Sequence, residues 1–205
     1  MKLYNGMSPN GIRVTIFLQE KGIDLPTQQI KIMSGETRGG AYLKINSLGE
    51  IPALELDDGQ ILTESVAICR YLEALNPKPA LMGTGPQEQA MIEMWNRRIE
   101  LNIFNIIGNV GRHEFDLFKG HVEQFPDFAA AQRREFVKRL GWLDEAMSDG
   151  RAFVAGDNFT IADITGMATL MLCTFTQLGI PAELTHVKKW ETSLRNRPSW
   201  PPLPG

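Results

Sequence analysis

The sequence is poor in the residues that crosslinks and metal sites require. It contains only two cysteines, Cys69 and Cys173, and three histidines in 205 residues. No Cys-x-x-Cys pair occurs, and the histidines are scattered at His113, His121 and His186. This pattern favours buried thiols in a reducing compartment and gives little support to a metal site. We therefore expect a cytoplasmic protein without a bound metal.

The chain also lacks a strong net charge and a long apolar run. Its 21 Lys and Arg against 24 Asp and Glu give a net charge of −3, so no basic field exists to hold nucleic acid or an anionic membrane surface. The longest near-apolar run, residues 166–175, is too short to span a bilayer. With 43% hydrophobic and 22% charged residues, the composition is that of one large or two modest folded domains. We expect neither a nucleic-acid nor a membrane partner.

The first 79 residues predict alternating strands and helices. Apolar segments predict strands at residues 2–4 and 27–32 and a hairpin around the turn signal Asp57-Asp58-Gly59. Helical spacing predicts helices at about 12–21, 42–45 and 65–75, with Gly22 ending the first. The order is βαβαββα. The breaker NPKP at residues 76–79 indicates that this first domain ends there.

After Pro86 the pattern is helical throughout. Amphipathic helices are predicted at about 87–110, 129–148, 160–177 and 182–195, with a polar and aromatic loop between the first two. Residues 86–205 are therefore predicted to form an all-α domain. Within it, Thr160 followed by Asp163 is a capping-box pattern, which predicts a tightly fixed helix start. Asp163→Ala should slow folding or lower stability and leave substrate affinity unchanged.

Two motifs, in this order, resemble those of the cytosolic glutathione transferases. They are EIPALELDDGQILTES at residues 50–65 and FTIAD at residues 159–163, and the resemblance covers essentially the whole chain. The stretches LYNGMSPNGIRVTIFLQEKGI and ILTESVAICRYLEAL are most similar to a bacterial and fungal subgroup that lacks the usual tyrosine. The resemblance implies an α/β thioredoxin-like domain over residues 1–79 that binds glutathione as co-substrate. It also implies an all-α helical bundle over residues 86–205 that takes a small-molecule electrophile, and a homodimer.

The resemblance places glutathione along the edge formed by Ile51 and Pro52. A proline lowers the free-energy difference between the cis and trans forms to about 0.5–1 kcal/mol. A cis Ile51–Pro52 bond would turn the main chain of Ile51 outward, where the cysteinyl backbone of glutathione pairs with it as an added strand. Glu64 and Ser65 stand at a helix N-terminus, which favours a carboxylate. We expect Ser65 to bind the γ-glutamyl carboxylate and Glu64 the neighbouring amine.

Two further residues complete the expected glutathione site. Glu50 occupies a position at which relatives contact the glutathione backbone, although its charge would repel the glycyl carboxylate. Arg38, in the loop segment GETRGG, is expected to offset that repulsion by reaching the same carboxylate.

The chemistry requires a thiolate, because a free thiol with a pKa of about 8.5 is mostly protonated at neutral pH. Ser8, which follows the first predicted strand, is the first candidate for stabilising the thiolate, and Asn10 is the second. Tyr4 is a rival, since other branches of the family use a tyrosine near the end of this strand. His113 is a further candidate, through an ordered water, and backbone amides remain the last alternative.

The predicted function is a glutathione S-transferase that activates the thiol for attack on small hydrophobic electrophiles. Peroxide or disulfide reduction stays open, because SPNG at residues 8–11 also resembles the TPNG of a disulfide-reducing branch. The alternative is a non-catalytic glutathione-binding interaction module. Pro52, Glu64 and Ser65 indicate binding, and only Ser8 indicates catalysis.

Overall fold

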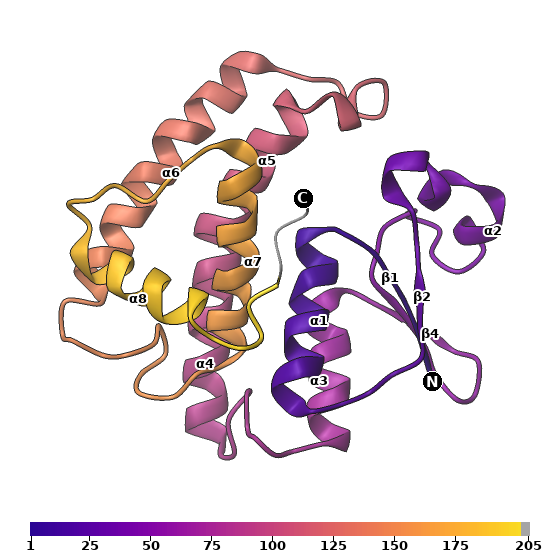
Figure 1. Cartoon of the computed structure of the whole chain (residues 1–205), viewed down its shortest axis with the longest axis horizontal. Helices are drawn as coiled ribbons and strands as arrows, with labels where there is room; N and C mark the ends of the chain where they lie inside the picture. Colours follow the sequence, from indigo (N-terminus) through magenta and orange to yellow (C-terminus); the bar gives the residue numbers. More distant parts are fainter. Residues whose placement is uncertain (202–205) are drawn as a thin grey trace. The chain divides into compact units, whose positions relative to one another are not determined.

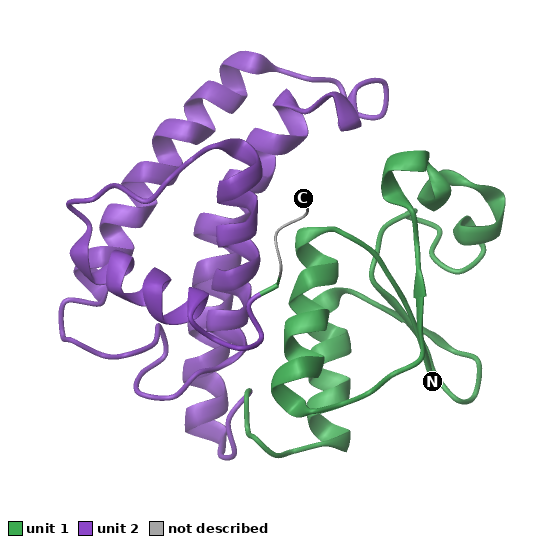
Figure 2. Cartoon of the chain, viewed as in Figure 1, with its two compact units in different colours: residues 1–81, 201–205 green, residues 82–200 purple. Residues whose placement is uncertain are grey.

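The structure, a computed structural model, describes residues 1–201 of the chain. These residues form two compact units, residues 1–81 and residues 82–200, and residue 201 groups with the first (Figure 2). The last four residues of the predicted domain 86–205 lie outside the described residues. The division between the units falls within the proline- and glycine-rich segment 76–86.

Unit 1 is built on a four-stranded mixed sheet. Its strands are β1 (Lys2–Asn5), β2 (Thr27–Gln29), β3 (Ala53–Glu55) and β4 (Ile61–Thr63), in the order β2-β1-β3-β4. β1 and β2 are parallel, whereas β3 is antiparallel to both β1 and β4. The hairpin turn between β3 and β4 contains Gly59 at φ 83°, a left-handed conformation that favours glycine. This is the predicted hairpin around Asp57-Asp58-Gly59.

The helices of unit 1 cover both faces of this sheet. α1 (Pro9–Lys21) and α3 (Ser65–Leu75) lie side by side, and the short α2 (Gly40–Leu43) lies across the sheet from them (Figure 1). Tyr4 of β1 and Ala53 of β3 pack in one buried cluster with Tyr42 of α2. Because successive side chains of a strand point to opposite faces, Leu3 and Leu54 point toward α1 and α3. The predicted order βαβαββα and the thioredoxin-like fold class are confirmed.

The loop between β2 and β3 departs from the prediction. The predicted strand 27–32 ends at Gln29, and two 3₁₀ turns follow, η1 (Ile32–Ser34) and η2 (Glu36–Arg38). The predicted helix at 42–45 lies two residues earlier, in α2. Gly35, at φ 77°, ends η1 in a left-handed conformation.

Among the described residues of unit 2, the elements of secondary structure are helices joined by loops. Its helices are α4 (Pro86–Ile99), α5 (Asn105–Glu114), α6 (Pro126–Ala146), α7 (Ile161–Thr176) and α8 (Thr185–Arg195). A π-helical turn, η3 (Glu100–Phe104), joins α4 to α5, so the predicted helix 87–110 is extended to Glu114 and interrupted in its middle. The predicted loop is correspondingly shorter and contains the 3₁₀ turn η4 (Asp116–Phe118).

The start of α7 is fixed by Asp163, a completely buried carboxylate. Its Oδ1 accepts hydrogen bonds from Val154 N at 3.0 Å and Trp190 Nε1 at 2.9 Å, and its Oδ2 accepts from Thr160 N at 2.9 Å and Thr160 Oγ1 at 3.0 Å. The predicted capping box with Thr160 is formed. Burial raises the pKa of Asp163, and these hydrogen bonds oppose that shift. Asp163 therefore links the loop before α7, the helix start and α8.

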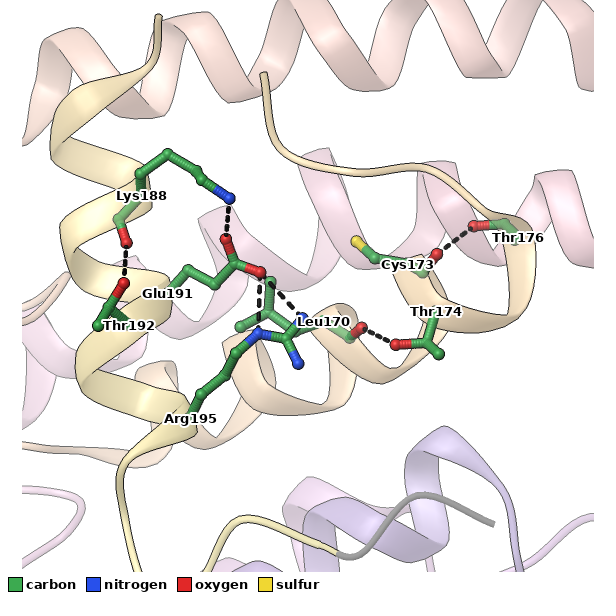
Figure 3. A network of polar contacts seen from close by, with 8 residues as sticks. All are labelled: Leu170, Cys173, Thr174, Thr176, Lys188, Glu191, Thr192 and Arg195. Carbon is green, nitrogen blue, oxygen red and sulfur yellow. Dashed lines mark hydrogen bonds and ion pairs between the residues drawn. The ribbon is translucent and has the colours of Figure 1, made fainter. Parts of the chain in front are cut away.

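A second polar group lies on α8 beside the end of α7 (Figure 3). Glu191 accepts from Lys188 Nζ at 2.8 Å and from Arg195 Nε at 2.9 Å, both on its own helix. Thr176, at the end of α7, donates to the carbonyl of Leu172 at 2.8 Å. These contacts support the helices internally. Although α7 is apolar, none of the helices in residues 1–201 is both long and apolar enough to cross a membrane.

Candidate functional site

Ser8 is the N-cap residue of α1. Its Oγ accepts a hydrogen bond from Gly11 N at 3.0 Å, and its side chain is half-buried. A serine hydroxyl has one hydrogen to donate in addition to its acceptor lone pairs. Because the oxygen already accepts from the helix, the hydrogen remains for an anionic group placed at the end of α1.

The turn before α1 is tightly packed around Gly11. Asn5 Nδ2 donates to Gly11 O at 3.1 Å. A Cβ added at Gly11 would lie closer than 3.0 Å to both Asn5 Oδ1 and Gly6 O, a distance that real Cβ atoms essentially never show. The position of Ser8 therefore depends on a glycine three residues later.

Gly11→Ala is expected to destabilise the protein by about 1–3 kcal/mol, because the new methyl group must push apart a packed turn. It should also lower activity by moving Ser8. Urea unfolding and steady-state kinetics measure the two effects. Gly141→Ala is the matched control, because Gly141 lies inside α6 with no atom within 4 Å of an added Cβ. That control should stabilise by up to about 1 kcal/mol, and equal effects of the two substitutions would contradict the packing argument.

The N-terminus of α3 presents a second polar position. Its N-cap residue, Glu64, has φ 67° and ψ 114° and makes no side-chain capping hydrogen bond. A non-glycine residue held in such a conformation costs about 1–3 kcal/mol and is typical of ligand sites. Ser65, the first residue of the helix, is 4% exposed, while the side chain of Glu64 is exposed. The helix end thus offers free N–H groups and a positive dipole end to an anion.

The segment before β3 lies against the turn that holds Ser8. The Ile51–Pro52 peptide bond is cis, and a Cβ added at Gly6 would lie 2.9 Å from Ile51 Cδ1. Neither the N–H nor the C=O of Ile51 is among the main-chain hydrogen bonds of residues 1–201. The carbonyl of Glu50, one residue earlier, is bound by Tyr42 Oη at 2.8 Å and by Asn46 Nδ2 at 2.7 Å. Tyr42 and Asn46, which the sequence reasoning missed, fix this segment.

The two remaining binding candidates lie at the same segment. The side chain of Glu50 is exposed. Arg38 Nη1 donates to Leu48 O at 3.0 Å, so the guanidinium lies beside the chain that leads to Glu50. The side chain of Arg38 is exposed.

Arg13 connects the candidates on α1 and α3. Its Nη1 donates to Ser65 Oγ at 2.7 Å and to Asn10 Oδ1 at 3.3 Å. Arg13 was missed because it occupies a buried position of an apolar helix, where arginine is rare unless it is paired. A charged residue inside the apolar stripe of residues 12–18 was the available signal.

The hydroxyl of Tyr4, the rival candidate for thiol activation, makes a hydrogen bond away from the candidate site. Its hydroxyl donates to Glu55 Oε2 at 2.7 Å, and the ring packs in the buried cluster with Tyr42. The hydrogen bond to Glu55, together with burial, raises the pKa of Tyr4. Glu55 lies at the far end of β3 from Pro52, so the Tyr4 hydroxyl points away from the candidate site.

Neither protein cysteine supplies a thiolate. Burial raises the pKa of Cys69 and of Cys173 to about 12. Both thiols are free and buried, as the sequence pattern predicts, and both are protonated at neutral pH. A thiolate nucleophile must therefore come from a bound thiol.

His113 belongs to unit 2 and lies in the last turn of α5 instead of in a loop. Its Nδ1 accepts a hydrogen bond from Phe125 N at 3.2 Å, and its ring contacts the rings of Phe125 and Phe128. A neutral histidine whose Nδ1 accepts carries its hydrogen on Nε2. In this state His113 can donate a hydrogen bond from Nε2 but cannot take a proton there.

The site that the described residues form is thus a set of donors at two helix ends. Ser8 and Asn10 stand at the start of α1 and Ser65 stands at the start of α3, joined through Arg13. The segment 50–52 adjoins the same turn. Such a set of donors suits an anionic ligand.

Comparisons with known proteins match both units. The family model "Glutathione S-transferase, N-terminal domain" matches residues 7–75, and "Glutathione S-transferase, C-terminal domain" matches residues 113–198. The chain is 33% identical over 195 residues to "Glutathione S-transferase 2" of Saccharomyces cerevisiae, which covers 93% of this chain and 83% of that protein.

Solved structures agree with these matches. A glutathione S-transferase domain-containing protein of Marinobacter aquaeolei VT8 superposes with a TM-score of 0.90 at 34% identity, covering 98% of this chain and 100% of the other. Gtt2 of Saccharomyces cerevisiae gives a TM-score of 0.90 at 31% identity, with 97% and 98% of the two chains covered.

Proposed function

Because this chain belongs to the glutathione S-transferase family, we propose that it binds glutathione on unit 1 and activates the thiol for attack on small hydrophobic electrophiles. The protein is a glutathione transferase, as are its relatives. The observation that carries the catalytic part of the proposal is the hydroxyl of Ser8. The Ser8 Oγ accepts a hydrogen bond from Gly11 N, so the hydroxyl hydrogen of Ser8 is available for donation to the thiolate.

The γ-glutamyl end of glutathione is proposed to bind at the start of α3. Its carboxylate receives the Ser65 hydroxyl and the N–H groups of the first turn, where the helix dipole favours a negative charge. Glu64, which is exposed and held at a positive φ by the chain, pairs with the ammonium group of the same residue. Charge-assisted hydrogen bonds of this kind are about twice as strong as neutral ones.

The cysteinyl and glycyl parts are proposed to follow the segment 50–52. The main-chain groups of Ile51, next to Pro52, pair with the cysteinyl backbone. The guanidinium of Arg38 reaches the glycyl carboxylate and offsets the charge of Glu50. This path directs the thiol toward the start of α1, where Ser8 and Asn10 donate to the developing thiolate.

His113 is retained as a second route to activation. Donation from its Nε2 would orient a water molecule that in turn donates to the thiolate. Because its Nδ1 already accepts from Phe125 N, the proposal gives His113 a donor's role and not that of a general base.

Ser65→Ala is expected to weaken glutathione binding about tenfold, the value of one charge-assisted hydrogen bond. Titration calorimetry measures the change directly. Ser148→Ala, at an exposed position after α6, is the control and should leave the dissociation constant unchanged. Equal affinities for Ser65→Ala and the unchanged protein would remove Ser65 from the site.

The reaction type is tested by steady-state assays with chloro-dinitrobenzene, cumene hydroperoxide and hydroxyethyl disulfide. We expect the highest turnover with the aromatic electrophile, and peroxide or disulfide reduction as lesser activities. No measurable activity with any of the three substrates, with glutathione binding intact, would contradict the proposed catalysis.

We further propose that the protein is a cytoplasmic homodimer. Two free, buried thiols suit a reducing compartment, which is also where reduced glutathione is abundant. Sedimentation equilibrium should give twice the mass of the chain, and a monomer over the working concentration range would overturn this part.

A further inference from the structure

Arg13 is a buried cation between two helices of unit 1. It is 1% exposed, and it is among the largest fully buried side chains of the described residues. Its charge also lowers the pKa of Cys69 on α3, against the larger effect of burial, so the guanidinium lies close to that helix. A cation in such a place is strongly unfavourable unless hydrogen bonds satisfy it.

The partners of Arg13 Nη1 decide how two site side chains are oriented. Arginine has five N–H donors and no acceptor. The 2.7 Å contact with Ser65 Oγ and the 3.3 Å contact with Asn10 Oδ1 therefore both run from arginine to oxygen. Ser65 must accept from Arg13, so its hydroxyl hydrogen points to another group. The amide oxygen of Asn10 must face Arg13, which turns its NH₂ group away from the guanidinium.

We propose that Arg13 is a positioning residue that fixes Ser65 as a hydrogen-bond donor to the γ-glutamyl carboxylate of glutathione. This inference rests on the proposed function. Without Arg13 the Ser65 hydroxyl can rotate and donate to other acceptors, and binding must then order it. Preorganised donors bind more tightly because that ordering has been completed in the free protein. Asn10 Oδ1 accepts from the same nitrogen at 3.3 Å and so helps to hold the guanidinium near Ser65.

The test is a double-mutant cycle on the full-length protein, using Arg13→Met, Ser65→Ala and the combined variant. Arg13→Met keeps the length and apolar bulk of the side chain and removes every donor. It should weaken glutathione binding about tenfold in calorimetry, as one lost charge-assisted bond would. It should raise KM for glutathione more than it lowers kcat, because the carboxylate contact is the same in the ground and transition states. Any fall in kcat would report the loss of the contact between Arg13 and Asn10, a candidate donor to the thiolate.

The decisive outcome is non-additivity. If Arg13 acts through Ser65, Arg13→Met should weaken binding less than about twofold when Ser65 is already alanine. A further tenfold loss in the combined variant would show that Arg13 acts independently of Ser65 and would overturn the proposal. Unchanged affinity for the single Arg13→Met variant would overturn it as well.

The Arg13→Lys variant and the glutathione affinity of the unchanged protein serve as controls for the cycle. Arg13→Lys retains the charge and a donor and should recover part of the affinity, with about a threefold loss, even if Arg13→Met does not fold. An Arg13→Lys variant that binds glutathione as weakly as Ser65→Ala, but unfolds at the same urea concentration as the unchanged protein, would contradict this expected recovery.

The failure of the proposed function can be told apart from the failure of this inference. If the unchanged protein binds no glutathione, the proposed function fails. If it binds glutathione and the cycle is additive, only the role of Arg13 fails.

Discussion

Replacing Asp163 by alanine is expected to lower the free energy of unfolding by about 3–5 kcal/mol. A lost N-cap alone typically costs about 1 kcal/mol, but Asp163 also accepts from Val154 N and Trp190 Nε1. The substitution leaves buried donors on the loop before α7, on the helix start and on α8 without their acceptor. Each unsatisfied buried group costs about 1–3 kcal/mol. The loss therefore exceeds that of an ordinary cap.

Urea unfolding followed by circular dichroism measures this change, and the melting temperature should fall by about 6–20 °C for a chain of this size. Glutathione affinity below the transition should be unchanged, because Asp163 lies in unit 2 and holds only structural partners. Asp157→Ala, an exposed acid in the same loop, is the matched control and should stay within about 0.5 kcal/mol. An unaltered melting temperature for Asp163→Ala would contradict the assignment of this network.

Ser8→Ala is expected to raise the pKa of the bound glutathione thiol by about 1–2 units. Each unit corresponds to about 1.4 kcal/mol of lost thiolate stabilisation. The sign follows from the charge: removing a donor to the thiolate disfavours the ionised form, so the thiol holds its proton to higher pH. If the bound thiol normally titrates near pH 6.5, the rate at that pH should fall about five- to fiftyfold, and at pH 9 less than about twofold.

The pH profile of kcat/KM and the ultraviolet absorbance of the thiolate measure the shift. Ser8→Thr keeps both the helix cap and the hydroxyl and should retain the original profile. Ser8→Asp also caps α1, but its carboxylate accepts hydrogen bonds and repels a thiolate, so it should lose more activity than Ser8→Ala at equal stability. If Ser8→Ala leaves the pH profile unchanged, activation must come from Asn10, from His113 or from backbone amides.

Much of the fold follows from signals that are local in the sequence. Asp57-Asp58-Gly59 specifies a hairpin, Gly22 ends α1, and Thr160 with Asp163 starts α7, because each of these motifs is complete within a few residues. Where a local signal was weak, the observed ends of strands and helices differ from the predicted ones. The strand expected to reach residue 32 stops at Gln29, and the 3₁₀ turn η1 begins at Ile32, which apolar spacing alone does not indicate.

The candidate site divides in the same way. Ser8, Glu64, Ser65 and Pro52 were found from motifs, and their roles toward glutathione stay predictions that the variants above test. The sequence could not indicate that Tyr4 gives its hydroxyl to Glu55, because 51 residues separate the two. It could not indicate that His113 ends a helix with its Nδ1 occupied.

By itself the sequence determined the order of elements, the two-part organisation and the family, because turns, caps and apolar periodicity act between near neighbours along the chain. Only the tertiary structure decided which side chains share a hydrogen bond. Arg13 and Ser65 are 52 residues apart, yet packing of α1 against α3 brings Nη1 to within 2.7 Å of Oγ. Because arginine has no acceptor, this contact makes Ser65 the acceptor of the hydrogen bond. Spacing along the chain does not reveal such a contact between distant residues.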